Sequence, residues 1–397
     1  MNAPPSLAFR DPIHGFIEAD ELEAALIRTR PMQRLRSIRQ LGLTHLVFPG
    51  AEHSRFGHAL GTMHLAGRVY DTLARAEDTP LEAGPRARAR RLVRAAGLLH
   101  DLGHAPFSHW AEELFEDGID HEEMSRRLLG GREIGAAFEQ HGDGLEARDV
   151  IRLLGDDLDG PERLLPPIVS GELDVDKMDY LLRDSLFCGV RYGNFDLDQV
   201  IATVRPLSCG AGGDHRLGID AEGLHAVEGL ILARYYMFTQ VYFHVTGKAL
   251  ELHLNEWLHE QGIAWSSDPE RFLANDDGEM MTRMRRSDSL HARAITDRSH
   301  FRLAHETGEH LDADEKRAFE QRLEPLRESY GKNVLVSNSA KDPHRLGRGR
   351  VPVRQNGGKL VQLEEASHFV RHLRRIDRYR VYCSDAVFDE VRLALGS

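Results

Sequence analysis

The chain of 397 residues has little cysteine, no excess of positive charge and no long apolar run. Its three cysteines, Cys188, Cys209 and Cys383, are odd in number and widely separated, which argues against a disulfide framework and against a cysteine-based zinc site. The 63 acidic residues outnumber the 51 basic ones and give a net charge of −12, so we expect no binding to long nucleic acids. No stretch approaches about 18 consecutive apolar residues, so we expect no membrane-spanning helix.

The N-terminal segment, residues 1–16, lacks the basic start and the apolar core of a secretory signal peptide. Together with the sparse cysteines, this predicts a cytoplasmic protein. The length allows a large buried core and about two or three domains.

Helical periodicity dominates the first two thirds of the chain. Apolar residues recur at three- and four-residue spacing in six segments, which are residues 58–76, 90–101, 121–129, 146–154, 174–186 and 222–260. Two short β-like runs at 204–207 and 216–219 flank a glycine-rich turn and predict a hairpin. Further β-like runs and a turn at Asn356 follow beyond residue 330.

This pattern predicts a mainly α protein in three parts. The first is a large helical region over residues 1–260, which contains the hairpin near 204–219. The second is a helical extension over residues 261–330, and the third is a small α+β region over residues 331–397.

Histidines are concentrated in one part of the chain and indicate a metal site. Seven of the 22 histidines lie between residues 53 and 121. An apolar helix runs into the adjacent pair His100 and Asp101. Neighbouring positions on a helix point about 100° apart, but at a helix end both side chains can approach one ion. Imidazole and carboxylate together suit a divalent ion such as iron, manganese or zinc, with magnesium as an alternative.

A lone His-Asp pair is also typical of a capped helix end, so a second observation has to support the metal site. Residues 173–184 place Asp176, Lys177, Asp179 and Asp184 among leucines and other core residues. Such charges are costly to bury without partners. A solvated helix face is one interpretation, and a further carboxylate ligand for the ion is the other.

Seven sequence blocks, taken in order, resemble the HD-domain deoxynucleoside triphosphate triphosphohydrolases, a family with mammalian and bacterial members. The resemblance covers about residues 9–260 and is carried by residues 11–15 (DPIHG), 33–36 (QRLR), 40–42 (QLG), 47–50 (VFPG), 55–58 (RFGH), 100–109 (HDLGHAPFSH) and 174–180 (DVDKMDY). It implies an HD-domain helical core, a divalent metal and the hydrolysis of dNTPs to a deoxynucleoside and inorganic triphosphate.

Matched residue by residue, the family pattern implies a role for each of several side chains. The metal ligands are expected to be His58, His100, Asp101 and Asp176. The catalytic histidine at the α-phosphate and the leaving oxygen is expected to be His121, supported by His104 and by Glu112, which stands where the family usually has aspartate. The substrate-binding residues are expected to be Gln40, Leu41, Arg55, His109, Lys177, Tyr180 and Asp184, with Gln40 and Leu41 lining the deoxyribose.

The resemblance also implies partners. Family members assemble as dimers or tetramers, so we expect a homo-oligomer. In mammalian members an aspartate reads an activating guanine, whereas Arg28 stands at that place here. Activation through that contact is therefore not expected, and another site for an activating nucleotide is left open.

Two other functions compete with dNTP hydrolysis. One is an HD phosphohydrolase that acts on nucleoside monophosphates or cyclic nucleotides, against which the blocks at Gln40-Leu41 and 174–180 argue. The other is a nucleotide sensor that binds without turnover. A sensor is expected to have lost a metal ligand or the catalytic histidine, and this chain has kept both.

Overall fold

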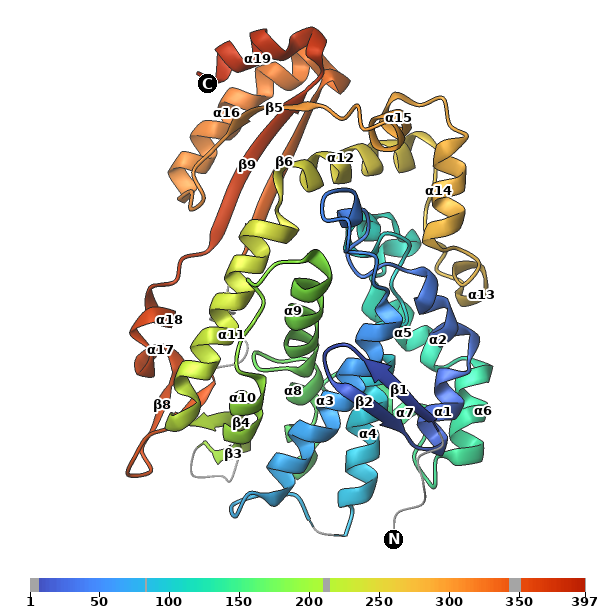
Figure 1. Cartoon of the computed structure of the whole chain (residues 1–397), viewed down its shortest axis with the longest axis vertical. Helices are drawn as coiled ribbons and strands as arrows, with labels where there is room; N and C mark the ends of the chain where they lie inside the picture. Colours follow the sequence, from blue (N-terminus) through green and yellow to red (C-terminus); the bar gives the residue numbers. More distant parts are fainter. Residues whose placement is uncertain (1–6, 83, 210–214, 343–350, 397) are drawn as a thin grey trace.

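Helices make up most of the protein, and three small sheets accompany them (Figure 1). The computed structural model describes residues 7–82, 84–209, 215–342 and 351–396. The prediction of a mainly α fold with an α+β C-terminal region is confirmed. Among the helices of the described residues, none has the length and apolar character needed to cross a lipid bilayer.

The elements follow one another along the chain with these bounds. The helices are α1 (Glu21–Ile27), α2 (Arg30–Arg34), α3 (Arg55–Arg75), α4 (Arg86–Leu99), α5 (His121–Leu129), α6 (Arg132–His141), α7 (Ala147–Leu154), α8 (Pro166–Val169), α9 (Val175–Cys188), α10 (Leu197–Thr203), α11 (Leu224–Met237), α12 (Val245–Glu260), α13 (Pro269–Phe272), α14 (Asp277–Arg285), α15 (Leu290–Thr296), α16 (Ala313–Tyr330), α17 (Leu363–Ala366), α18 (His368–His372) and α19 (Phe388–Leu395). The strands are β1 (Leu7–Asp11), β2 (Gly15–Ala19), β3 (Val204–Ser208), β4 (His215–Asp220), β5 (Arg302–Glu306), β6 (Val334–Lys341), β7 (Pro352–Arg354), β8 (Leu360–Gln362) and β9 (Ile376–Cys383).

Five of the six predicted helical segments correspond to single helices, α3, α4, α5, α7 and α9. The sixth, residues 222–260, is divided into α11 and α12 by a π-helical turn over Phe238–Tyr242. The break has a local cause: the side chain of His244 accepts a hydrogen bond from the backbone N–H of Thr246 and caps the new helix. Apolar periodicity alone does not reveal such an interruption.

The sheets connect segments that are distant in sequence. β3 and β4 pair antiparallel over Val204–Asp220, and the glycine-rich turn expected at 210–214 lies outside the described residues. β4 then pairs with β7, so the sheet order is β3-β4-β7-β8, whereas β5, β9 and β6 form a separate sheet. The helical extension expected over 261–330 contains one strand besides its helices, β5, which pairs with β9 from the C-terminal part of the chain. The boundaries of the three expected parts stay a proposal.

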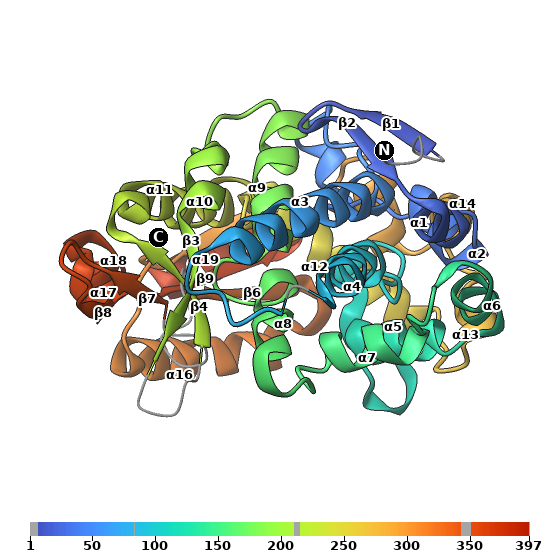
Figure 2. The ribbon, with the colours of Figure 1, turned by 90° about the horizontal axis from the view of Figure 1, so that it is seen from below.

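Helix α3 lies at the centre of the helical body and positions the functional side chains. It packs against α4 on one side and α9 on another (Figure 2). Small residues permit this close packing: a Cβ on Gly97 of α4 would lie 2.9 Å from the backbone oxygen of Thr62 on α3. Most residues along α3 are buried in the main apolar core, while α16, α19 and the β5-β9-β6 sheet share a smaller core of their own.

Candidate metal and nucleotide site

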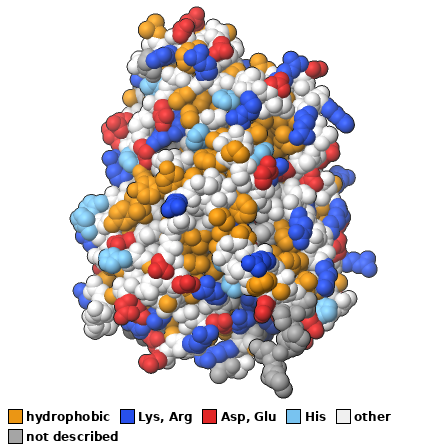
Figure 3. All heavy atoms as spheres, viewed as in Figure 1, with side chains coloured by type: hydrophobic (Ala, Val, Ile, Leu, Met, Phe, Trp, Pro, Cys, Tyr) orange, Lys and Arg blue, Asp and Glu red, His pale blue; other side chains and the backbone are white. Residues whose placement is uncertain are grey.

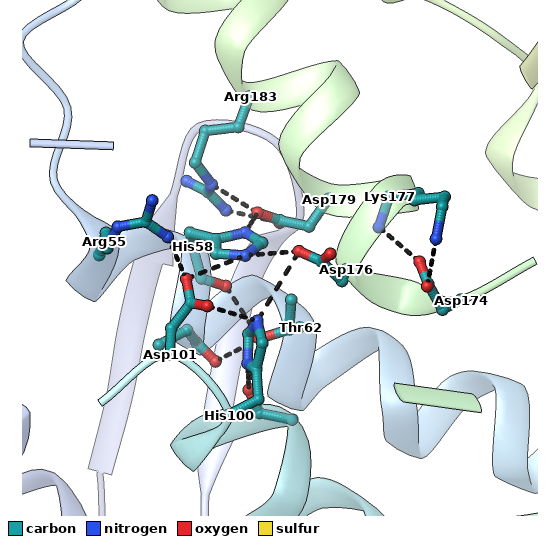
Figure 4. Close-up of polar contacts among 12 residues, drawn as sticks. Arg55, His58, Thr62, His100, Asp101, Asp174, Asp176, Lys177, Asp179 and Arg183 are labelled. Atoms are coloured by element: carbon teal, nitrogen blue, oxygen red, sulfur yellow. Dashed lines mark hydrogen bonds and ion pairs between the residues drawn. The ribbon is translucent and has the colours of Figure 1, made fainter. Parts of the chain in front are cut away.

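The four predicted metal ligands converge from three helices. His58 lies in the first turn of α3, His100 and Asp101 follow the end of α4, and Asp176 lies in the first turn of α9 (Figure 4). The Nε2 atom of His58 lies 3.0 Å from Asp176 Oδ1 and 3.7 Å from Asp101 Oδ2. The Nε2 atom of His100 lies 3.2 Å from Asp101 Oδ1 and 3.7 Å from Asp176 Oδ1. Helix ends therefore bring two imidazoles and two carboxylates to one point.

The hydrogen bonds of the two imidazoles point their other nitrogens into this cluster. Nδ1 of His58 donates to Oδ2 of Asp179 at 2.8 Å, and Nδ1 of His100 donates to the backbone oxygen of Gly97 at 2.9 Å. Both Nε2 atoms are buried and face the carboxylates of Asp101 and Asp176. Imidazole nitrogens that converge with carboxylates in this way are the donor set that a divalent transition metal takes once the imidazoles are deprotonated. The residues present therefore fit the metal that the sequence predicts.

The carboxylates and imidazoles of the cluster shift one another's pKa values strongly. Burial lowers the pKa of His58, but hydrogen bonds to Asp176 and Asp179 and the negative charges of Asp179 and Asp101 raise it to about 10. Burial raises the pKa of Asp176, but the two imidazoles hold it well below its usual range. The carboxylates thus attract protons onto the histidines, and a bound metal would have to displace those protons.

A second layer of charged residues supports His58. Asp179 accepts hydrogen bonds from Nε2 of His14 at 2.7 Å and from Nε and Nη2 of Arg183 at 2.8 Å each. Arg183 also donates to Oδ2 of Asp11 at 2.8 Å. A Cβ on Gly61 of α3 would lie 1.8 Å from Asp179 Oδ1, so the glycine leaves the room that this carboxylate occupies. The sequence analysis assigned no role in the site to Asp11, His14, Asp179 or Arg183, although three of them lie in the 11–15 and 174–180 blocks.

Asp179→Asn is expected to lower metal affinity about 10- to 100-fold, because loss of such a carboxylate behind a ligating histidine has effects of this size. The amide can no longer hold the proton on Nδ1 of His58 with a full negative charge. Competition against a chelator, at one pH, measures the affinity. The matched control is Asp174→Asn, since Asp174 caps the same helix and pairs with Lys177 instead of a metal ligand. Equal affinities in both variants would contradict the role of Asp179.

A second cluster of imidazoles lies beside the first. Glu112 accepts hydrogen bonds from Nδ1 of His121 and, at 2.8 Å, from Nδ1 of His109. The ring of His104 is buried and lies 4.2 Å from the ring of His121 and 4.8 Å from that of His109, measured between centroids. The longer side chain of glutamate therefore still reaches the predicted catalytic histidine.

Buried His104 and half-buried His121 have opposite pKa shifts. Burial lowers the pKa of His121, but the hydrogen bond and the charge of Glu112 outweigh it and leave the pKa above the ordinary value. Burial, together with the positive charges of Arg55 and His121, holds the pKa of His104 well below the ordinary value. The surroundings thus favour the protonated form of His121 and the neutral form of His104, an arrangement suited to proton donation by His121.

Arg55 and Asp101 connect the two clusters. Nη1 of Arg55 donates to Asp101 Oδ2 at 2.5 Å, and its Nε donates to Ser108 Oγ at 2.8 Å. Nδ1 of His104 lies 3.3 Å from Asp101 Oδ1. The carboxylate of Asp101 therefore contacts two other predicted ligands, His58 and His100, as well as Arg55 and His104.

Comparison with known proteins agrees with this geometry. The family model of the HD domain matches residues 55–184, which include all four predicted ligands, and that of the HD associated region matches residues 210–396. The chain belongs to the HD-domain family. A crystal structure of a hypothetical protein from Aquifex aeolicus superposes on it with a TM-score of 0.82 at 32% identity, over 98% of this chain and 99% of that one.

Two relatives with named activities indicate the class of chemistry. A phosphohydrolase from Bacteroides thetaiotaomicron superposes with a TM-score of 0.74 at 26% identity, over 95% of this chain and 99% of that one. The deoxynucleoside triphosphate triphosphohydrolase SAMHD1 homolog of Dictyostelium discoideum is 32% identical over 68% of this chain and 54% of its own length. The chain spans about half the length of the curated relatives it matches, from 46% to 61% for three of them.

The remaining predicted residues of the HD domain take part in buried contacts near the ligands. Asp184 accepts hydrogen bonds from Nε2 of His53 and from the hydroxyl of Tyr242, both at 2.8 Å. The ring of Tyr180 meets Tyr242 edge to face, with centroids 6.3 Å apart. The sequence analysis gave His53 and Tyr242 no role, although His53 lies between two of the family blocks.

Two predicted substrate residues face different surroundings. Lys177 is turned away from the ligands: its Nζ pairs with Asp174 at 2.5 Å and donates to the backbone oxygen of Gly171 at 2.6 Å (Figure 4). Gln40 is buried, and its Oε1 has no hydrogen-bond partner among the described residues. Leu41 beside it packs against the main core. The amide oxygen of Gln40 is thus available to accept a hydrogen bond. The ammonium group of Lys177 has to leave Asp174 to reach a phosphate.

Proposed function

We propose that this HD-domain phosphohydrolase cleaves dNTPs to a deoxynucleoside and inorganic triphosphate. The observation that carries the proposal is the position of the His121–Glu112 pair next to a donor set that fits a metal, with Arg55 and Asp101 between them. The name of the Dictyostelium relative supports the same substrate class. An acid, a buried cation and a metal site are the parts that phosphoester hydrolysis needs.

His58, His100, Asp101 and Asp176 would hold the divalent metal. When bound, such an ion lowers the pKa of a water molecule and polarises a phosphoryl oxygen. A triphosphate carries about four negative charges, so further positive groups have to face it. Arg55 is buried and fixed by Asp101 and Ser108, and we assign it to the phosphates.

The leaving group in this reaction is the 5′-oxygen of the deoxynucleoside, which needs a proton. His121 is the donor in our proposal, because Glu112 raises its pKa and orients its ring through Nδ1. That bond leaves Nε2 of His121 to transfer the proton. His104 packs against His121 as a neutral ring, and His109 shares Glu112 on the solvent side.

Gln40 and Leu41 are proposed to line the deoxyribose, where a 2′-hydroxyl would be excluded. Tyr180 and Asp184 are proposed to contact the sugar from α9. The hydroxyl of Tyr242 and the ring of His53 fix the Asp184 carboxylate in one orientation, which makes it a defined acceptor for a sugar hydroxyl.

We expect the rate to fall on the alkaline side as His121 loses its proton. Hydrogen bonding to Glu112 and its negative charge raise the pKa of His121, so the protonated form persists to a higher pH than for an ordinary histidine, and the alkaline limb of kcat/KM is displaced to higher pH in the same sense. Glu112→Gln removes the negative charge that raises this pKa and is expected to move the limb to lower pH. Profiles of kcat/KM against pH at saturating metal measure this. An alkaline limb at the same pH in both proteins would remove His121 as the acid.

The test of the proposed function is a substrate panel on metal-supplemented protein. Each dNTP is supplied alone and in mixtures, with the matching rNTPs, and the products are separated by chromatography. Deoxynucleoside with intact triphosphate and a preference for deoxyribose supports the proposal, and activity only in mixtures adds an activating nucleotide. Activity confined to monophosphates or cyclic nucleotides, or binding without products, would overturn it in favour of the two competing functions.

The surface agrees with a small anionic substrate better than with a nucleic-acid strand. On the face seen in Figure 3, basic and acidic side chains are interspersed among apolar and neutral ones. A polynucleotide groove would need basic side chains gathered along a track. We also propose, from the family resemblance, a cytoplasmic homo-oligomer, for which size measurement in solution is the test.

A further inference from the structure

Asp277 carries a buried carboxylate that bridges two segments of the site. It lies in the first turn of α14 and is 2% exposed. Its Oδ2 accepts a hydrogen bond from the backbone N–H of Arg39, and its Oδ1 accepts one from the backbone N–H of Phe107, both at 2.9 Å. Both oxygens of one carboxylate thus hold the backbones of two segments that are distant in sequence.

The two residues whose N–H groups bond to Asp277 lie one or two positions before a residue that the proposed function assigns to the substrate. Arg39 precedes Gln40, and Phe107 comes two positions before His109. Ser108 joins the same two segments directly, since its Oγ donates to the backbone oxygen of Arg39 at 2.7 Å. The position of Gln40, proposed to line the sugar, relative to the histidine cluster of His104, His109 and His121 therefore depends on the three hydrogen bonds made by Asp277 and Ser108.

The loop that Asp277 holds has a conformation that needs support. Phe107 and Ser108 have φ values of 65° and 58°, in the left-handed region that side chains other than glycine rarely adopt. Gly42 allows the loop to lie where it does, because a Cβ there would be 2.8 Å from the Phe107 backbone oxygen. Strain of this kind persists only where surrounding contacts fix the backbone, and Asp277 supplies one of them.

Arg34 of α2 connects the start of the loop to the residues that precede and begin α14. It donates from Nη1 to the backbone oxygen of His104 and from Nε to that of Asn275, both at 2.8 Å. Its guanidinium lies 4.4 Å from the ring centre of Phe272. Residues 272–277 thus contact the loop directly through Asp277 and are linked to it a second time through Arg34.

We propose that Asp277 is a positioning residue, through which the HD-associated region fixes the sugar pocket relative to the catalytic loop over residues 104–109. The proposal extends the proposed function, because it relies on that function for the role of the two segments. Asp277 itself contacts neither the predicted metal ligands nor His121. Its effect on hydrolysis is exerted through the backbones of Arg39 and Phe107.

The first test is hydrogen exchange of Asp277→Asn, which depends on no activity. Asparagine offers one acceptor oxygen and no charge, so one of the two buried N–H groups faces an NH₂ group and the other donates to a weaker, neutral acceptor. We expect amides in residues 38–42 and 104–109 to exchange about tenfold faster, both together, with α14 unchanged. The matched control is Asp276→Asn, because asparagine caps α14 as well as aspartate does, and its exchange should equal that of the wild type. Faster exchange throughout α14, or in only one segment, would overturn the proposal.

The second test is the ratio of kcat/KM for a dNTP to that for the matching rNTP. This ratio does not depend on the fraction of folded protein, so a loss of stability alone leaves it unchanged. Asp277→Asn is expected to lower it about fivefold or more, and Asp276→Asn to leave it as in the wild type. An unchanged ratio in Asp277→Asn would overturn the proposal. A wild type without dNTP hydrolysis would refute the proposed function, and the exchange test would still decide on Asp277.

Asp277→Asn could fail to fold, and a second variant covers that case. Ser108→Ala removes the direct bond between the two segments and leaves Asp277 in place. It is expected to accelerate exchange in residues 38–42 and 104–109 together. Exchange at the wild-type rate in both segments would show that these bonds do not couple them, and would overturn the proposal.

Discussion

Replacing His100 and Asp101 by alanine is expected to abolish metal binding and turnover together. The change removes two of the four ligands and leaves His58 and Asp176, which are too few to hold a divalent ion tightly. It also frees Arg55 from its carboxylate partner. Because both residues follow the end of α4, the helices themselves should persist. Metal content of the purified protein, circular dichroism and the rate of dNTP loss measure the three effects.

The matched control for this double variant is His141→Ala with Asp143→Ala, since His141 ends α6 as a half-buried residue and Asp143 follows that helix as an exposed one. That control should keep the metal and the wild-type rate. Metal retained by the His100→Ala, Asp101→Ala protein would contradict the ligand assignment. Loss of helical circular dichroism would show that the pair also holds the fold.

His121→Asn is expected to lower kcat about 10²- to 10⁴-fold while metal content and dNTP binding stay as in the wild type. This is the range that loss of a general acid costs. Asparagine preserves a polar group next to Glu112 but cannot donate a proton from a cationic ring. The measurements are kcat under saturating dNTP and the affinity for a non-hydrolysable dNTP analogue.

The control for His121→Asn is His225→Asn, since His225 also donates from Nδ1 to a glutamate, at 2.8 Å, but on an exposed part of α11. Its kcat should equal that of the wild type. A His121→Asn protein with a near-wild-type rate would remove His121 from the mechanism. Loss of metal in that variant would instead place His121 among the groups that hold the ion.

The expected metal ligands could be named from the sequence, whereas the residues that support them could not. The family resemblance implies His58, His100, Asp101 and Asp176, and helix periodicity puts three of them at helix ends. The structure brings these four side chains together through the packing of α3 on α4 and α9. Their role as ligands stays a prediction.

The supporting residues depend on contacts between distant segments. In the sequence, nothing distinguishes Asp179 from the other acidic residues of α9. Its role follows from the hydrogen bonds that His14 and Arg183 donate to it. Asp277 has no motif of its own, because its partners are backbone N–H groups, which every residue except proline carries. Likewise β5 forms only where β9 pairs with it.

Rotamers are a third property that patterns do not give. Lys177 has the position expected of a phosphate-binding residue, yet its ammonium group pairs with Asp174. The choice depends on a carboxylate three residues earlier that also caps α9. The sequence alone places Lys177 on the helix and does not determine which way its side chain points.

The most direct test of the central claim is hydrolysis of a dNTP in ¹⁸O-labelled water, followed by mass spectrometry of the products. Our account places the attack of water at the α-phosphorus and the break between that phosphorus and the 5′-oxygen. It therefore predicts one ¹⁸O atom in intact inorganic triphosphate and none in the deoxynucleoside. Label in orthophosphate or pyrophosphate, or in the deoxynucleoside itself, would contradict it.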